Sequence, residues 1–135
     1  MNRFFVALVL MSASLLGTSS AYSSESRTPE QVISELVSAM EANDAEHIRS
    51  LFAENATQEY ERWYARKKTG DKFRAWLESD IIDVHGRVTN PTLMADDKQA
   101  IVIGTYVNND NYRSPADFLF IVEDGKIVSW TMRYD

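Results

Sequence analysis

Titratable residues stand at two places in the sequence where their neighbours could support acid–base chemistry. Asp117 stands in an otherwise apolar stretch, residues 116–122, and a carboxyl group buried there would favour its neutral, proton-donating form because desolvation penalises the charge. His85 alternates with Asp83 and Arg87. On a strand all three side chains would share one face, where Asp83 could orient the imidazole as a base.

Each of these candidates also has a structural explanation. Acids are common at strand ends near turns, so Asp117 could be solvated or paired with Arg113. The alternation around His85 is also that of a solvated strand face. His47 lies among charged residues on a predicted exposed helix and is interpreted as a surface residue. The residues alone leave both interpretations of Asp117 and His85 open.

Composition argues against several other functions. The chain has no cysteine and two histidines far apart, so a zinc site would need carboxylates as its remaining ligands, and we predict neither a metal nor another cofactor. Twenty acidic residues against 14 basic ones argue against nucleic-acid binding, which depends on neutralising phosphates.

The first 21 residues are typical of an export signal. A positive start is followed by an apolar run, Phe4 to Leu16, which is too short to span a bilayer, and Ala21 ends a cleavage sequence of small residues. We therefore expect a signal peptide over 1–21, a flexible lead-in over 22–28 and one domain over 29–135. The mature protein would be periplasmic or secreted, without further membrane insertion.

Three helices are predicted in the first half of the domain. Thr28 caps the first, with Gln31 at capping-box spacing, and its apolar stripe is Val32, Ile33, Leu36, Val37 and Met40. Asp44 caps a second, shorter helix that ends near Asn55. Residues 57–69 fit either a helix or the beginning of a short strand, and Gly70 opens the third helix.

From residue 81 the apolar period changes to two. We predict strands at roughly 81–95, 99–109, 113–123 and 126–134, with Asp124-Gly125 as a hairpin turn because both residues tolerate positive φ. Helices followed by an antiparallel meander indicate an α+β fold in which the helices cover one face of a curved sheet.

Three segments, in this order, resemble the nuclear-transport-factor-2-like superfamily, which includes the SnoaL-like cyclases and the ketosteroid isomerases. They are Ala42-Asn43-Asp44 with the run Leu51 to Thr57, then Gly70 to Phe73 leading into Trp76-Leu77, and finally Asp124 to Val128 ending in Tyr134-Asp135. Together they extend over almost all of the predicted domain.

The resemblance implies a cone-shaped, cystatin-like half-barrel with a pocket between the concave sheet face and the helices. Ungapped matching on the last hairpin places Asp117, Leu119 and Ile121 on the pocket side, together with Trp130, Met132 and Tyr134. It places Phe118, Phe120, Val122 and Tyr106 on the convex face. An aromatic convex face implies a homodimer formed through the sheet.

The same matching tests one activity of the superfamily. The tyrosine position of the ketosteroid isomerases is occupied here by Leu36, and the position of their base by Tyr60, with Glu59 one residue away. The position of their protonated acid falls on Asp117. Two of the three roles are missing, so we do not expect steroid isomerisation.

We therefore expect an exported domain that binds a small apolar ligand, with Asp117 as its polar anchor. The expected lining is Leu36, Met40, Tyr60, Trp63, Trp76, Trp130, Met132 and Tyr134, although the same residues could form an ordinary filled core. One alternative is an enzyme that uses Asp117, with Glu59 or His85, for isomerisation, dehydration or cyclisation. Another is a protein-interaction module.

Overall fold

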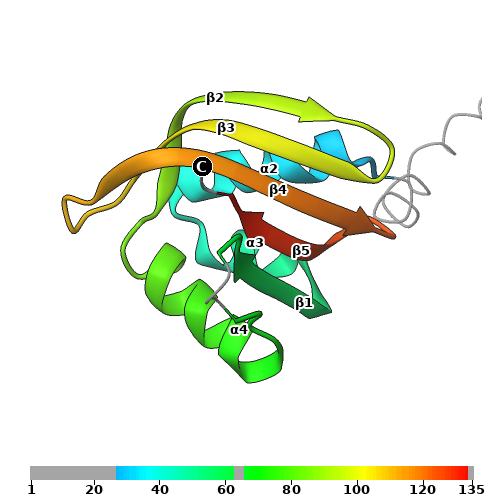
Figure 1. Cartoon of the computed structure of the whole chain (residues 1–135), viewed down its shortest axis with the longest axis horizontal. Helices are drawn as coiled ribbons and strands as arrows, with labels where there is room; N and C mark the ends of the chain where they lie inside the picture. Colours follow the sequence, from blue (N-terminus) through cyan, green and yellow to red (C-terminus); the bar gives the residue numbers. More distant parts are fainter. Residues whose placement is uncertain (1–26, 63–65, 134–135) are drawn as a thin grey trace, which may run out of the picture.

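A computed structural model of the chain describes residues 27–62 and 66–133, which form helices on one face of a five-stranded sheet (Figure 1). The elements are α2 (Pro29–Ala42), α3 (Ala45–Ser50), β1 (Phe52–Tyr60), α4 (Gly70–Trp76), the π-helix η1 (Leu77–Ile82), β2 (Arg87–Ala95), β3 (Gln99–Val107), β4 (Arg113–Glu123) and β5 (Lys126–Met132).

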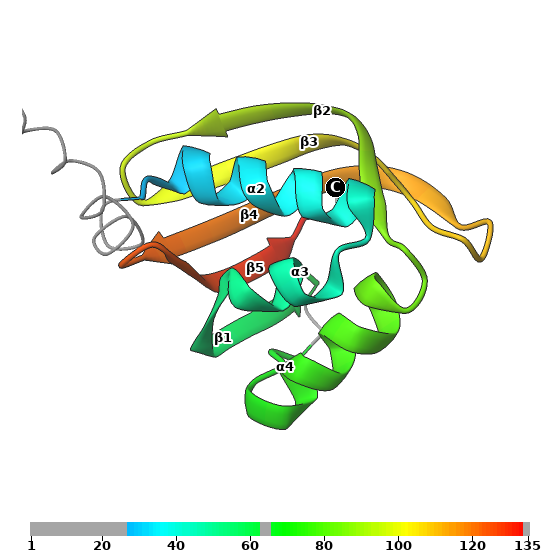
Figure 2. The same ribbon diagram turned by 180° about the vertical axis from the view of Figure 1, so that it is seen from behind.

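The strand order is β1-β5-β4-β3-β2, and only the β1–β5 pair is parallel. Helices α2 and α3 lie on the side of the sheet that faces the viewer in Figure 2, α4 lies below the β1 edge in both views, and the opposite side of the sheet faces the viewer in Figure 1. The predicted α+β architecture is confirmed. The proposed signal peptide and most of the lead-in lie outside the described residues.

The first helix forms as its sequence predicts. Thr28 and Gln31 make both hydrogen bonds of a capping box, at 3.1 Å and 2.9 Å, and Asn43 ends the helix in the left-handed conformation. Asp44 then caps α3 by accepting a hydrogen bond from the His47 amide. The apolar stripe of α2 is buried against β2, β3 and β4.

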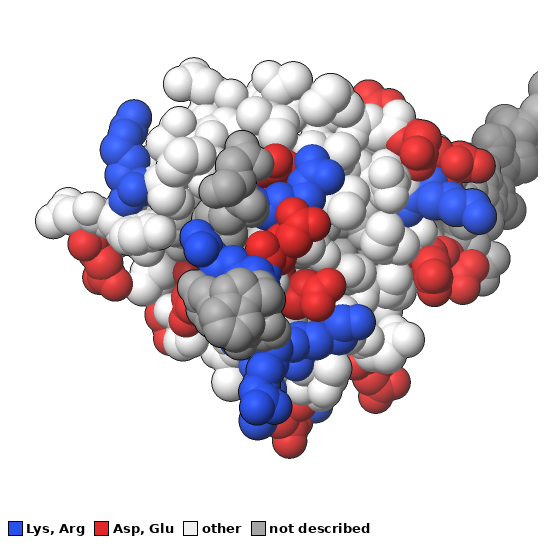
Figure 3. All heavy atoms as spheres, in the orientation of Figure 1, with Lys and Arg blue, Asp and Glu red and all other residues white. Residues whose placement is uncertain are grey.

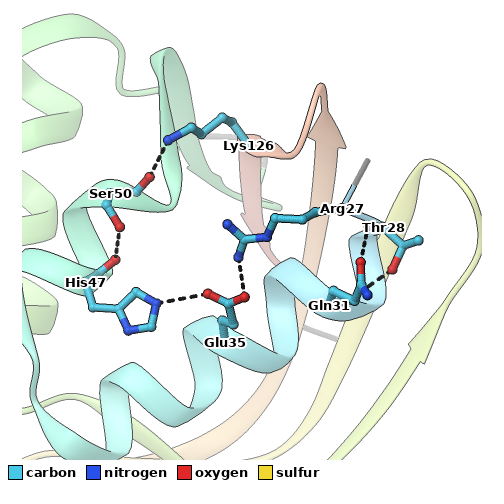
Figure 4. Close-up of polar contacts among 7 residues, drawn as sticks. All are labelled: Arg27, Thr28, Gln31, Glu35, His47, Ser50 and Lys126. Carbon is cyan, nitrogen blue, oxygen red and sulfur yellow. Dashed lines mark hydrogen bonds and ion pairs between the residues drawn. The ribbon is translucent and has the colours of Figure 1, made fainter. Parts of the chain in front are cut away.

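Glu35 connects α2 to its neighbours. Its carboxylate contacts the Arg27 guanidinium through one oxygen and His47 Nε2 at 3.0 Å through the other (Figure 4). Burial raises the pKa of Glu35, but the His47 hydrogen bond and the Arg27 charge outweigh it, so that the net pKa is lowered.

The core is centred on Trp130, which is fully buried. Its ring centroid lies 4.9 Å from that of Phe120, 5.4 Å from that of Phe118 and 5.1 Å, edge to face, from that of Trp76. Aromatic pairs at these distances stabilise a core beyond their buried area. This cluster joins β4, β5 and α4.

A β-bulge in β5 decides which side chains enter that core. Val122 pairs with Ile127 but Ile121 pairs with Ser129, so Val128 is an extra residue in the ladder. An ungapped hairpin would place Trp130 opposite Leu119, whereas the bulge places it opposite Phe120.

The predicted facing of β4 is therefore wrong. Asp117, Leu119 and Ile121 lie on the outer face, away from the helices, and Phe118, Phe120, Val122 and Tyr106 are buried on the inner face. The convex face does not carry these aromatic residues. The alternation within β4 and within β5 is as predicted, but the extra residue reverses one of these strands relative to the other.

Two predicted boundaries are also wrong. The second helix ends at Ser50 rather than near Asn55, because the chain from Phe52 pairs with β5 and the Leu51 carbonyl accepts a hydrogen bond from the Ile127 amide. Residues 81–86 are not a strand, because Ile81 and Ile82 continue the buried face of α4 through η1. The open choice for 57–69 is resolved as far as Tyr60, which ends β1.

We expect Glu35→Gln to lower the free energy of unfolding at pH 7 by no more than about 1 kcal/mol, because the pair is partly exposed. A lowered folded-state pKa contributes stability above the unfolded pKa of the carboxyl group, and this contribution is lost as the pH falls through the folded value. Urea unfolding at pH 7 and pH 3 should show the difference from the parent protein shrinking in acid. The control is Glu54→Gln, which removes the same charge at an exposed position of β1. A difference independent of pH would contradict the ion-pair assignment.

Candidate functional site

A cavity of about 540 Å³ lies between the helical segment α4–η1, the turn that joins β3 to β4, and the inner face of the sheet. Five of its 13 lining residues are aromatic, and polar side chains gather at the helical and turn side. The lining residues are Tyr60, Trp76, Ser79, Asp80, Ile81, Val84, Tyr106, Asn108, Asp110, Tyr112, Ser114, Phe118 and Met132.

The π-helix shapes one side of the cavity. The Asp83 amide donates to the Glu78 carbonyl, five residues back, and the Gly86 amide donates to the Ile81 carbonyl in the same way. A π-turn widens the helix and is often found at functional sites. Trp76, Ser79 and Asp80 lie at helical spacing on the side that borders the cavity.

Tyr106 on β3 is hydrogen-bonded to the end of η1. Its hydroxyl donates a 2.9 Å hydrogen bond to the Asp80 carbonyl, one of the last carbonyls of η1, which lack donors within the helix. Asn108 Nδ2 donates to the same hydroxyl at 3.4 Å. Burial raises the pKa of Tyr106 more than the Asn108 hydrogen bond lowers it, and the charge of Asp80 adds to the rise.

The lack of a side chain at Gly86 leaves space for the Tyr106 ring that makes this hydrogen bond. A Cβ atom built on Gly86 would collide with the Tyr106 hydroxyl and would lie 2.9 Å from Cε1 of the same ring. Glycine at this position therefore lets β3 and the end of η1 approach closely enough for the hydrogen bond to form.

Asn108 also shapes the turn between β3 and β4. Its Oδ1 accepts hydrogen bonds from the Asp110 amide at 2.8 Å and the Tyr112 amide at 3.3 Å. This polar turn over 108–111 holds Asp110 and Tyr112 at the cavity. The Tyr112 ring lies 6.0 Å from the Tyr106 ring.

Tyr60 forms the opposite wall, at the end of β1. Its hydroxyl accepts a 3.4 Å hydrogen bond from Trp76 Nε1, and Lys68 Nζ lies 4.9 Å from the centre of its ring. Burial is the main reason that the pKa of Tyr60 is raised, and the charge of Asp80 contributes in the same direction.

The charged side chains that line the cavity are both acidic, Asp80 and Asp110. Among the described residues that line it there is no lysine, arginine or histidine. Within the described part of the chain, no three histidine or carboxylate side chains are grouped so as to hold a metal ion. The arrangement can bind an organic molecule between aromatic walls and hold its polar end near the carboxylates.

The structure divides the predicted lining set. Tyr60, Trp76 and Met132 line the cavity. Leu36, Met40 and Trp130 lie in the buried core and not at the cavity, so for these three the filled-core alternative describes their place. Trp63 and Tyr134 lie outside the described residues.

The predicted acid–base residues are not brought together. Asp117 is on the outer face, where Arg133 contacts its Oδ1 through Nη2 at 2.8 Å and Nε at 3.0 Å. The paired alternative for Asp117 therefore holds, with Arg133 in place of Arg113. Glu59 pairs with Thr131 and has the opposite facing to Tyr60, which borders the cavity.

His85 is also away from the cavity lining. It lies in the turn after η1 with φ 53°, and its Nε2 is 2.9 Å from the Glu41 carbonyl of α2. The predicted strand alternation with Asp83 and Arg87 is wrong, because Asp83 belongs to the end of η1. His85 instead helps to attach this turn to α2.

Sequence reasoning missed Asp80, Tyr106 and Tyr112 as cavity residues. Asp80 was missed because a strand is predicted from residue 81, whereas the helical segment continues through η1 to Ile82. Tyr106 was placed on the convex face by the ungapped hairpin. The available signal was the pair of tyrosines that flank the polar turn at 108–111, since residues beside a shaped turn are frequent binding residues.

The outer face of the sheet carries an apolar patch, which we call the outer patch: Met94, Ile101, Ile103, Leu119 and Ile121. Met94 is 51% exposed and Ile103 37% exposed, and the other three are half-buried. Figure 3 shows this face, which is largely uncharged in its upper part, over β2 and β3, with charged side chains gathered lower in the view.

Comparison with known proteins gives one family model and many solved structures that share the fold. The family model described as the SnoaL-like domain matches residues 33–130. A search of curated protein sequences finds no match. Among solved structures, a protein from Pseudomonas putida KT2440, provisionally described as a polyketide cyclase, is 18% identical with a TM-score of 0.64 and coverage of 81% of this chain and 92% of that one.

Two further structures share the fold. One, from Kribbella flavida DSM 17836, is provisionally described as a ketosteroid isomerase, with 18% identity, a TM-score of 0.66 and coverage of 79% of this chain and 77% of that one. The other is a protein of unknown function with a cystatin-like fold from Xanthomonas campestris, with 12% identity, a TM-score of 0.64 and coverage of 78% and 89%. At these identities the likeness concerns the fold alone.

We expect Gly86→Ala to lower the free energy of unfolding by about 1–3 kcal/mol, because the added methyl group displaces the Tyr106 ring. Urea unfolding of Gly86→Ala, Tyr106→Phe and the double variant gives a double-mutant cycle. The cost of the alanine should be smaller when the hydroxyl is absent. Strictly additive costs would contradict the close approach.

Proposed function

This chain belongs to the SnoaL-like domain family, and from that premise we propose that it binds a small organic ligand with a mostly apolar body in the cavity between η1 and the β3–β4 turn. The observation that carries the proposal is the cavity itself. Its volume of about 540 Å³ is in the range of small-molecule sites, and its wall combines aromatic side chains with a few polar groups.

The cavity has the rigidity that a binding site requires. Tyr106 is held by hydrogen bonds to Asp80 and Asn108, and Trp76 packs against the buried Trp130. Walls that are fixed before binding lower the entropy cost of association.

We also propose that the domain acts outside the cytoplasm, after removal of residues 1–21 as a signal peptide. The support is the sequence pattern of that segment. Within the described residues, no helix is both long enough and apolar enough to cross a membrane.

The outer patch supports association into a homodimer. Exposed apolar surface on a sheet face is unfavourable in water and commonly marks an interface between chains. The corrected facing of β4 removes the aromatic residues from this surface but leaves aliphatic ones, Leu119 and Ile121, beside Ile101 and Ile103.

An enzyme is the second candidate, and one observation favours it. The Asp80 carboxylate borders the same cavity as the neutral phenol of Tyr60, so a base and a phenol face one ligand. The provisional names of two structural neighbours, a cyclase and an isomerase, fit such chemistry. Asp80→Asn separates the candidates, because it should abolish turnover in an enzyme and only weaken affinity in a binding protein.

Native mass spectrometry of the mature protein, purified from its own host, should detect a defined small molecule retained by the parent protein. Ser114→Trp should lose it, because the indole fills the cavity from β4. Asn55→Trp, at an exposed position on β1, is the control and should retain it. Circular dichroism checks that each variant is folded. Equal retention by a folded Ser114→Trp protein would contradict the cavity as the binding site.

Sedimentation equilibrium should show a dimer for the parent protein and a dissociation constant at least about tenfold higher for Ile103→Glu, since the new carboxylate would be buried at the interface. Asn55→Glu introduces the same charge away from the outer patch. A monomeric parent protein, or equal dissociation constants for the parent and Ile103→Glu, would contradict the dimer.

A further inference from the structure

The cavity's wall and charge together indicate the chemistry of its ligand. We propose that the polar end of the ligand is an organic cation, an alkylated ammonium group, held against the tyrosine rings beside Asp80 and Asp110. This inference rests on the proposed function and specifies the ligand class of the same site.

The first argument is the arrangement of aromatic rings. Tyr106 lies 6.0 Å from Tyr112 and 6.4 Å from Phe118, with the rings tilted at 60° and 64°, so that neighbouring rings meet edge to face. Trp76 and Tyr60 add two more aromatic side chains from the other wall. Aromatic side chains on two sides of a cavity suit an ammonium group, which is attracted to the electron-rich face of a ring.

The second argument is the sign of the charge. The two charged residues of the lining are carboxylates, Asp80 on η1 and Asp110 in the β3–β4 turn. Both are solvent-exposed as residues, so they lie on the open side of the cavity and attract a cation there. An anionic ligand would meet repulsion from both.

Two basic side chains near the cavity, Arg87 and Lys68, contact protein groups outside it or on its edge. The Arg87 guanidinium donates to the His85 carbonyl at 2.7 Å and to Asn109 Oδ1 at 3.3 Å. Lys68 is positioned over the Tyr60 ring and is not part of the lining. Its ammonium nitrogen, 4.9 Å from the ring centre, is itself an example of a cation on a tyrosine of this site.

The third argument concerns the phenols. Burial and the negative charge of Asp80 raise the pKa of Tyr60 and of Tyr106, so both hydroxyls stay neutral in the physiological range. Of these two causes only the negative charge of Asp80 also favours a cation, because burial disfavours any charged group. The hydroxyl oxygens of Tyr106 and Tyr60 already accept hydrogen bonds from Asn108 Nδ2 and Trp76 Nε1. An alkylated ammonium group, which needs few hydrogen-bond acceptors, therefore fits better than a strongly hydrated primary amine.

Three probes of nearly equal shape test the charge preference. They are [4-(hydroxymethyl)phenyl]trimethylammonium, its neutral carbon isostere 4-tert-butylbenzyl alcohol, and the anion 4-tert-butylbenzoate. Isothermal titration calorimetry on the mature protein should give the cation an affinity at least about tenfold higher than that of the alcohol, with the benzoate weakest. The preference for the cation should fall as sodium chloride is raised.

Asp80→Asn should reduce the ratio of cation to alcohol affinity at least about threefold, while the affinity for the alcohol changes little. Asp83→Asn makes the same change of charge three residues away, at an exposed position outside the lining, and should leave the ratio unchanged. Ser114→Trp should remove binding of all three probes.

The outcomes separate this inference from the proposed function. If the alcohol or the benzoate binds as tightly as the cation and Ser114→Trp removes binding, the cation inference is wrong and the cavity still binds ligands. If the cation binds best but Ser114→Trp has no effect, or if no probe binds, the inference is also overturned. Loss of a retained ligand in the mass spectrometry experiment tests the proposed function independently of these probes.

Discussion

The extra residue in β5 is the constraint on which the site depends. Because Val128 interrupts the ladder, Trp130 and Met132 share the inner face with Phe120 and Phe118. Trp130 then becomes the centre of the aromatic core, and Phe118 and Met132 continue it to the cavity wall. The same residue sends Asp117 to the outer face, where Arg133 neutralises it. The bulge at Val128 therefore leaves the Asp117–Arg133 ion pair on the outer face and the aromatic side chains on the inner face.

The cavity lies beside this packed core, where the end of η1 and the β3–β4 turn are fixed to the sheet around it. The hydroxyl of Tyr106 binds the Asp80 carbonyl of η1, and Asn108 links the same tyrosine to the β3–β4 turn. Gly86 permits the approach. These contacts fix Asp80, Tyr106 and Tyr112 relative to one another, so the acidic and aromatic character of the wall is built into the fold and would exist before a ligand arrives.

The sequence predicted local features well and relations between strands poorly. The capping box at Thr28, the Asp44 cap and the Asp124-Gly125 turn depend on neighbouring residues, and all three form as predicted. The facing of Asp117 depends on a bulge that no local pattern marks, and the strand predicted from Ile81 depends on which element buries that side chain. The expected lining correctly includes Tyr60, Trp76 and Met132. Asp80 and Tyr106 could be placed at the cavity only with the correct end of the helical segment and the correct strand register.

The most direct test of this account is the carbon-13 methyl NMR spectrum of the methionines in the mature protein, because each reports a different place. Met132 lines the cavity, Met94 lies in the outer patch, and Met40 lies on the buried face of α2. Adding the trimethylammonium probe or its neutral isostere should shift the Met132 signal, dilution should shift Met94, and Met40 should respond to neither. A ligand that shifts Met94 and leaves Met132 unchanged would contradict the cavity as the functional site.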